Sequence, residues 1–442
     1  MKNTKLGLVC VSLEGEKTDL ARKFKKQAVK SLQNENVEVV NAQKDITLSG
    51  QEAIAQCREA EDAGADAIVF LIGTWILCDH VIDAARSISL PMGVWGIPEP
   101  ISFSSVGANA VHGTMEEIGI RHRLFYGEAD DSEVTGEIAA FTRAASAYRQ
   151  CRSARFGLIG GRAISAYTTA ADPNQIKEVF GTEVEHIDQL ILLERARGIR
   201  EEQVDELVAL VKGRYGAVEA DEEYVRKSVS LYAALKEIKE EYELDFFSVK
   251  CLGELMDTYT SCCLALAMLN DEGIVANCQC SVNAALSMYI MSKLTDDPPY
   301  FGDVNTVIKK EGVARLINCG SIPGRLAQSM EDVKIVNQYE YMGKGRGACT
   351  FFCCKEGDVT FGTLGRIHGR YVMSIAEGQA FQEPMEKLAE VRTWAQGFVR
   401  LNCDPMKFYE NLRSNHCAAC YGKCMPELIE FCRIAGIEYI EN

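Results

Sequence analysis

A histidine and three cysteines stand together near the C-terminus, in the run HCAACYGKC at positions 416–424. Cys417, Cys420 and Cys424 have the spacing C-x2-C-x3-C and follow His416 directly. Thiolates favour iron–sulfur clusters or zinc over harder metals, so one interpretation of this spacing is a soft-metal site. In the alternative interpretation, the three thiols pack as small hydrophobic side chains at the start of the helix that follows Cys424.

Polar side chains also follow strand-like apolar runs directly. Lys250 and Glu254 come after the predicted strand 245–249, and Arg162 comes after a glycine pair that ends another such strand. Ligands of parallel α/β sheets bind beyond the carboxyl ends of the strands, and glycine there lets the backbone approach an anion. Trp75 follows a third strand, where it either contacts a ligand or packs in an interface. The full dinucleotide fingerprint G-x-G-x-x-G is absent, which argues against nucleotide binding.

The N-terminal part of the chain alternates strand and helix patterns. Continuous apolar runs such as DAIVFLI (66–72) are typical of buried parallel strands, and helix-like stretches such as 19–32 separate them. This alternation predicts a doubly wound parallel sheet. A second alternating region begins near Ala154, and short strands with frequent turns follow Pro298. We therefore predict two doubly wound α/β domains, at 1–150 and 151–297, and a C-terminal, mainly β domain at 298–442 with a closing helix at 425–435.

The composition argues against several classes of partner. The chain has 442 residues, with 47 basic and 63 acidic side chains and a net charge of −16. Proteins that bind nucleic acid need basic patches to neutralise phosphate, and the same holds for anionic membranes, so we expect neither partner. The N-terminus lacks a signal-peptide pattern, and no apolar stretch is long enough to span a membrane, so we expect a cytoplasmic protein. Its 18 cysteines should then be mostly reduced.

Several segments, in their order and spacing, give the chain a resemblance to a known family. The chain resembles the L-fucose/L-arabinose isomerase-like proteins, in a short form of about this length, from its first strand to its last helix. The segments that carry the resemblance are FLIGTWILCD (70–79), GVWGIPEP (93–100), FGLIGGRAISAYTTAAD (156–172), SVKCLGEL (248–255), LALAMLNDEGIVANCQCSVNAALSMYIMSKLTDDPPYFGD (264–303), INCGSIP (317–323) and SNHCAACYGKCMPELIEF (414–431).

The resemblance implies an architecture and an activity. It implies two α/β domains and a C-terminal domain with a β-barrel, a divalent metal that is usually manganese, and assembly as a trimer or hexamer. The implied reaction is aldose–ketose isomerisation of a pentose, a deoxyhexose or a modified hexose. Two carboxylates can move the proton between C1 and C2, and a metal can stabilise the enediolate. In the family pattern, Glu254 matches the first acid and His416 matches the metal-binding histidine.

The second acid of the family pattern is missing. Gln279 and Ser281 stand where acidic residues are expected after the strand near 280, so we predict an altered metal shell of Glu254, His416, Ser281 and Gln279. Asp303 lies in another matching segment and either supplies the second catalytic carboxylate or caps a turn. We expect His416 to lie in a polar loop between two apolar helices, within metal-bridging distance of Glu254.

Three functions remain open from the sequence. The first is an isomerase with the altered shell, in which Trp75, Lys250 and Arg162 contact the sugar; Arg162, Lys250, Arg346 and Arg370 are also candidates for recognising an acidic substituent. The second is another enzyme class on the same scaffold, with redox, lyase or dehydratase chemistry at an iron–sulfur cluster or zinc. Its candidate ligands are Cys280, Cys417, Cys420 and Cys424. The third is a sugar-binding protein without catalysis.

Overall fold

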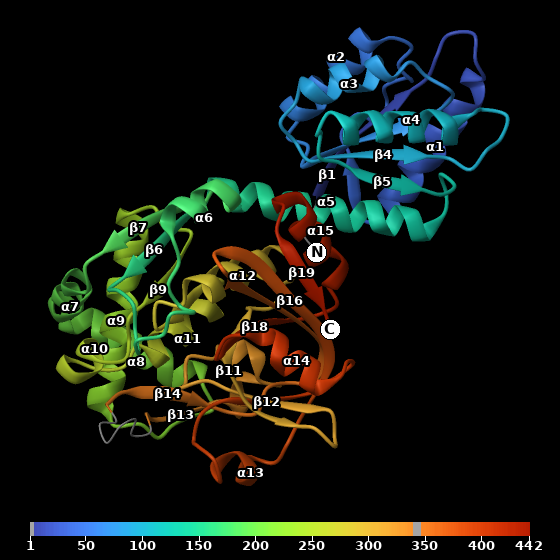
Figure 1. The fold of residues 1–442 in the computed structure, drawn as a ribbon. Helices are drawn as coiled ribbons and strands as arrows, with labels where there is room; N and C mark the ends of the chain where they lie inside the picture. The colour runs from blue at the N-terminus through green and yellow to red at the C-terminus, as the bar shows by residue number, and fades with distance from the viewer. Residues whose placement is uncertain (1–3, 339–345) are drawn as a thin grey trace. The chain divides into compact units, whose positions relative to one another are not determined.

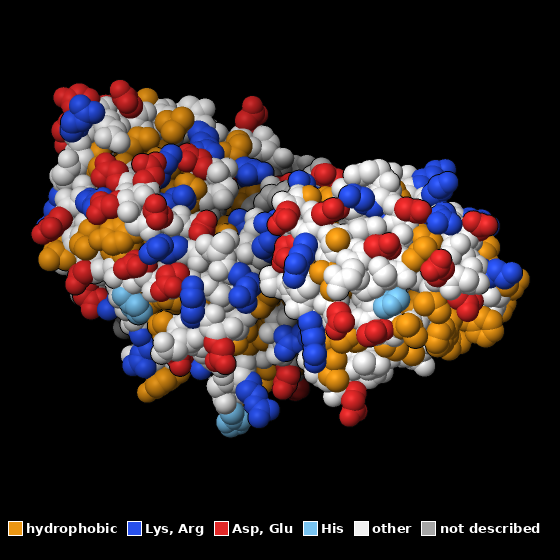
Figure 2. All heavy atoms as spheres, turned by 90° about the horizontal axis from the view of Figure 1, so that it is seen from above, with side chains coloured by type: hydrophobic (Ala, Val, Ile, Leu, Met, Phe, Trp, Pro, Cys, Tyr) orange, Lys and Arg blue, Asp and Glu red, His pale blue; other side chains and the backbone are white. Residues whose placement is uncertain are grey.

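The computed structural model describes residues 4–338 and 346–442, and the chain divides into two compact units (Figure 1). Unit 1 comprises residues 1–150 and 426–435, and unit 2 comprises residues 151–425 and 436–442. In the described ranges, every helix is too short or too polar to cross a membrane. Figure 2 shows acidic and basic side chains interspersed over the face in view. This face therefore has no broad basic patch of the kind that nucleic-acid binding needs.

Unit 1 contains a five-stranded parallel sheet in the order β2-β1-β3-β4-β5. Alternate residues of β1 face opposite cores: Leu6 and Leu8 pack on one side of the sheet, and Val9 and Val11 on the other. Helices therefore cover both faces, as a doubly wound sheet requires. The strands are β1 (Thr4–Val11), β2 (Val37–Val39), β3 (Ala67–Ile72), β4 (Met92–Gly96) and β5 (Arg123–Tyr126), and the helices are α1 (Thr18–Asn34), α2 (Gly50–Asp62), α3 (Cys78–Arg86), α4 (Ser104–Glu117) and α5 (Ser132–Ser153).

Unit 2 begins with a second parallel sheet, in the order β10-β9-β6-β7. Ile159, at the end of β6, pairs with Val249 at the end of β9, and Val249 pairs with Cys278 at the end of β10. The loops after these three strands therefore leave the same edge of the sheet. The strands are β6 (Arg155–Ile159), β7 (Glu183–Ile187), β9 (Phe246–Val249) and β10 (Ala276–Cys278), and the helices are α6 (Pro173–Phe180), α7 (Gln189–Gly198), α8 (Glu201–Arg214), α9 (Glu222–Glu241), α10 (Glu254–Thr258), α11 (Cys263–Asp271) and α12 (Val282–Leu294).

The C-terminal part of unit 2 is a closed antiparallel barrel of six strands, in the order β15-β18-β11-β12-β17-β16, and the pairing of β16 with β15 closes it. Strands β8, β13 and β14 form a separate small sheet. Strand β19 pairs in parallel with β16 of the barrel. The remaining strands and α-helices of the chain are β8 (Ala217–Val218), β11 (Tyr300–Ile308), β12 (Val313–Ile317), β13 (Lys334–Asn337), β14 (Ala348–Phe351), β15 (Gly357–Ile367), β16 (Arg370–Phe381), α13 (Met385–Ala389), β17 (Gln396–Leu401), α14 (Pro405–Leu412), β18 (His416–Tyr421), α15 (Met425–Ala435, nearly all in unit 1) and β19 (Glu438–Glu441).

The predicted fold class, two parallel-sheet α/β domains and a β-barrel, is confirmed. One local prediction is wrong: His416 lies not in a polar loop but at the start of strand β18, which pairs with β11 and β15. Small, buried side chains fill this strand, and the pairing partners lie about 60 and 115 residues away in sequence, so local patterning could not reveal them.

Candidate functional site

His416 and Asp303 face each other across two barrel strands. Asp303 of β11 is the register partner of His416 in β18, and Nε2 of the imidazole lies 3.9 Å from Oδ1 of the carboxylate. The imidazole is 1% exposed, and Nδ1 lies 3.1 Å from the Ser281 hydroxyl. The Phe301 ring packs beside it, with the ring centroids 4.7 Å apart. The barrel therefore holds the histidine rigidly against a carboxylate.

Burial sets the protonation of this pair. It lowers the pKa of His416 to about 4, so the ring is neutral at pH 7 and one nitrogen keeps its lone pair. Burial raises the pKa of Asp303 to about 7, with a further contribution from the charge of Cys319, although 39% of the Asp303 side chain is exposed. The amide of Asn415 donates to Asp303 at 3.2 Å and opposes the shift. Asp303 can therefore both accept and give a proton near neutral pH.

The segment after β10 supplies Gln279 and Ser281. Both side chains are buried, and Oε1 of Gln279 has no hydrogen-bond partner among the described residues. Gln279 and Cys280 both adopt positive φ, of 64° and 48°, in the tight turn that leads to Ser281 and α12. Strained backbone of this kind persists where the surrounding structure fixes it and often lies at functional sites.

Glu254 begins α10, after the end of β9. Its carboxylate pairs with Lys250 at 2.8 Å and is 68% exposed, and this interaction lowers the pKa of Glu254. The charge of Lys250 also acts on Cys280, whose pKa burial raises to about 12, so the loops after β9 and β10 are neighbours. That Glu254 shares a metal ion with His416 stays a prediction.

The donor atoms beside His416 fit a hard divalent cation. One imidazole nitrogen of His416 and the Ser281 hydroxyl, with the Gln279 amide oxygen two residues before Ser281, are nitrogen and oxygen donors of the kind that manganese accepts. The unpartnered, buried Oε1 of Gln279 supports this fit, because a buried acceptor without a donor is costly unless a cation or water satisfies it.

The four cysteines predicted as soft-metal ligands make separate contacts. The Cys420 and Cys424 sulfurs lie 3.3 Å apart, and the Cys280 thiol donates to the Ile159 carbonyl at 3.4 Å. Cys417 is buried, and burial raises its pKa, so this sulfur is a thiol rather than a thiolate. A common metal or cluster for these four residues stays a prediction.

A different group of cysteines adjoins the Asp303 region, and the sequence analysis missed it. Cys251 accepts a hydrogen bond from the Cys262 backbone N–H at 3.2 Å, and the Cys263 thiol donates to the Cys319 carbonyl at 3.0 Å. Hydrogen bonds from the thiols of Cys263 and Cys278 lower the pKa of Cys319 to about 5. These residues come from four separate segments, so no spacing motif could reveal them.

The predicted sugar-contacting residues lie on both units. Trp75, in unit 1, is 39% exposed, and its backbone N–H donates to the Ser102 carbonyl at 2.9 Å. In unit 2, the Arg162 guanidinium covers the ring of the exposed Tyr167, 4.7 Å from its centroid. A Cβ added to Gly160 would meet the Cβ of Lys250 at 2.7 Å, so the turn before Arg162 packs on Lys250. Lys250 and Arg162 therefore follow neighbouring strands at one sheet edge.

Of the other two candidate arginines, Arg346 donates to the Asp257 carbonyl at 3.0 Å, and Arg370 begins β16 in the barrel.

Comparisons with known proteins agree with this architecture. The family model described as "L-fucose isomerase, first N-terminal domain" matches residues 5–153, and the one described as "L-fucose isomerase, C-terminal domain" matches residues 316–441. The sulfoquinovose isomerase of Alkalicoccus urumqiensis is 23% identical over 327 residues, covering 72% of this chain and 73% of that protein. The sulfoquinovose isomerase of Clostridium sp. (strain MSTE9) is 26% identical over 310 residues, covering 67% of this chain and 69% of that protein. That of Priestia aryabhattai is 19% identical over 99% of both chains.

Proposed function

Because this chain belongs to the L-fucose isomerase-like family and is an aldose–ketose isomerase, we propose that its reaction passes through an enediolate formed beside Asp303 and His416. The observation that carries this proposal is the pairing of Asp303 with His416 across two barrel strands, with the carboxylate oxygen 3.9 Å from the imidazole nitrogen. Burial supports it, because it raises the pKa of Asp303 and lowers that of His416. A carboxyl group with a pKa near the working pH can act as base and then as acid on one substrate.

Asp303, His416 and Glu254 have different roles in the proposed reaction. Ionised Asp303 takes the hydrogen on C2 of the aldose as a proton, this proton exchanges with solvent on the carboxyl group, and Asp303 then gives a proton to C1, while one proton passes from O2 to O1. The net change is the conversion of an aldehyde at C1 into a ketone at C2. Neutral His416 can accept or ligate through its free nitrogen, with Ser281 fixing the ring through a 3.1 Å contact. Glu254, kept ionised by Lys250, is the second carboxylate.

A divalent metal fits this proposal, with His416, Gln279, Ser281 and Glu254 as its ligands. Such an ion polarises the sugar oxygens and stabilises the negative charge of the enediolate. Manganese agrees with the nitrogen-and-oxygen donor set. The exposed position of Glu254 leaves it free to turn toward a sugar or a metal.

We propose sulfoquinovose, a hexose with a sulfonate on C6, as the substrate. Three relatives, which each cover at least two thirds of this chain, are named sulfoquinovose isomerase. With a net charge of −16, the chain needs a local cationic site to bind an anionic sugar. Lys250 and Arg162, after neighbouring strands of one sheet, are the groups that we assign to the sulfonate.

The test follows the purified protein with sulfoquinovose in D2O, with glucose, L-fucose and L-arabinose as comparison sugars and with manganese added. We expect a ketose product that carries solvent deuterium at C1, detected by NMR. Conversion without deuterium would contradict the enediolate route, since a hydride shift retains the substrate hydrogen. Conversion of the uncharged sugars at equal efficiency would contradict the assignment of the sulfonate site.

A further inference from the structure

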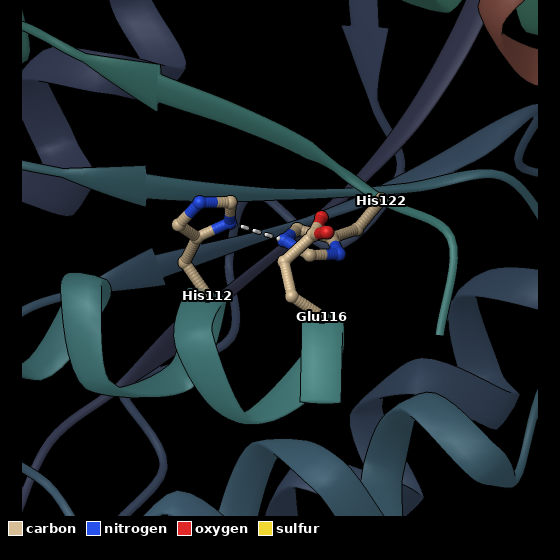
Figure 3. A group of neighbouring side chains, drawn as sticks. All are labelled: His112, Glu116 and His122. Carbon is tan, nitrogen blue, oxygen red and sulfur yellow. Dashed lines mark hydrogen bonds between the residues drawn. The ribbon is translucent and has the colours of Figure 1, made fainter. Parts of the chain in front are cut away.

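Unit 1 brings two histidines and a glutamate together, none of which takes part in the proposed reaction. His112 and Glu116 lie four residues apart on one face of α4, and His122 immediately precedes β5 (Figure 3). One ligand atom from each of the three side chains lies within 4.8 Å of the others. In residues 4–338 and 346–442, this is the single set of three histidine, cysteine or acidic side chains that satisfies this distance limit.

The hydrogen bonds fix the state of the His122 ring. Its Nδ1 lies 2.8 Å from the Ile120 carbonyl oxygen, which can only accept, so Nδ1 carries the proton. In the neutral ring, Nε2 then has a free lone pair, and it points at Nδ1 of His112, 2.7 Å away. The bond from the outer nitrogen to a backbone carbonyl is the arrangement that orients metal-binding histidines.

Nε2 of His122 and Nδ1 of His112 are too close for both to present lone pairs, so a proton or a cation must lie between them. A proton on His112 Nδ1 satisfies the pair without a metal. A cation does so equally once the His112 proton moves to Nε2, and the Glu116 carboxylate, which forms no ion pair with any described lysine or arginine, can then balance its charge. Two zinc–nitrogen bonds of ~2.05 Å at a tetrahedral angle separate the nitrogens by roughly 3.3 Å. The facing nitrogens of the half-buried His112 and His122, now 2.7 Å apart, need to separate by only about 0.6 Å to reach that spacing.

We propose that His112, Glu116 and His122 form a binding site for a divalent transition-metal ion of the zinc type. Two imidazole nitrogens and one carboxylate suit zinc, whereas calcium and magnesium take oxygen ligands. Three protein ligands leave a fourth position for water, and the exposed Glu116 puts that position at the surface. The ion ties the C-terminal end of α4 to the start of β5, so zinc binding stabilises unit 1.

The test measures bound zinc per chain after equilibrium dialysis of the full-length protein, together with the unfolding temperature. The variants are His122→Gln and Glu116→Gln, and the matched control is His186→Gln, which removes an exposed histidine of unit 2. All variants retain the 18 cysteines and the Asp303–His416 region, so zinc bound there is the same in each.

We expect His122→Gln to lose one equivalent of zinc and the zinc-induced rise in unfolding temperature, and Glu116→Gln to weaken binding at least ~10-fold. The control should bind zinc as the unaltered protein does. Equal stoichiometry and an equal temperature rise in His122→Gln would overturn the proposal. If His122→Gln fails to fold, Glu116→Gln decides, because this exposed helical side chain can be replaced without disturbing the core, and unchanged affinity in it overturns the proposal.

Discussion

Asp303 Oδ1 lies 3.9 Å from His416 Nε2, and the two residues are register partners in adjacent strands of a closed barrel. A barrel has no free edge, so this pair cannot drift apart as two loop residues can. The residues are 113 positions apart in the sequence, and only the pairing of β11 with β18 brings them together. This fixed geometry makes Asp303 the first residue to test.

Asp303→Asn should reduce kcat by ~10²-fold or more while the protein stays folded. The amide cannot take the C2 proton, and general base groups contribute roughly this factor. Turnover measured by NMR and the unfolding temperature measured by circular dichroism separate the two effects. The control is Asp358→Asn, in β15 of the same barrel, which should retain full activity. An Asp303→Asn variant with more than about a tenth of normal turnover would rule out a catalytic role.

Glu254→Gln should abolish turnover and leave stability nearly unchanged. The side chain is 68% exposed, so its replacement removes charge from the site without opening a cavity. Glu240→Gln, at an exposed position of α9, is the matched control and should behave as the unaltered protein. If the two variants turn over substrate equally, Glu254 is a surface charge that pairs with Lys250 and nothing more.

The protein should assemble as a trimer or a hexamer. Unit 1 exposes several large apolar side chains around the loops that follow β3, β4 and β5, where a second chain can cover them. They are Trp75, Ile101, Phe103, Val106 and Tyr126. Light scattering at micromolar concentration should give a mass three or six times 48.8 kDa. A mass of one chain would contradict this prediction, and Phe103→Ser with Tyr126→Ser should shift the assembly toward smaller species.

The sequence predicts the regular elements well where the signal is local. The helix 425–435 has the predicted bounds, and the apolar run 66–72 forms strand β3 (Ala67–Ile72), because a buried apolar run and an amphipathic period are properties of neighbouring residues. The strand that begins at His416 was missed, because small residues become a strand only through partners far away in the chain.

For the same reason, the sequence could name Asp303 and His416 but not their spacing. The sequence does not reveal clusters of side chains that come from distant parts of the chain. The cysteines around Cys319 come from separate segments of the chain, and the four-residue spacing of His112 and Glu116 indicates one helix face but not the position of His122 beside it.

The half-buried Cys319 offers a test of the electrostatics around Asp303. Hydrogen bonds from the thiols of Cys263 and Cys278 lower the pKa of Cys319 and so favour its negatively charged thiolate form. Burial raises the pKa of Asp303 to about 7, and the nearby negative sulfur adds to this rise. Because ionised Asp303 is the base, kcat/KM should increase with pH through the region near 7 and then level off.

Cys319→Ser removes the negative charge, because a serine hydroxyl does not ionise in this range. The pKa of Asp303 should therefore fall, and the rising limb of the kcat/KM profile should move to lower pH, while the plateau stays near its original height. Cys78→Ser, a half-buried cysteine of unit 1, is the control and should leave the limb in place. A profile measured from pH 5 to 9 distinguishes the outcomes. A lowered plateau with an unmoved limb would mean that Cys319 supports the packing of the site rather than the charge of Asp303.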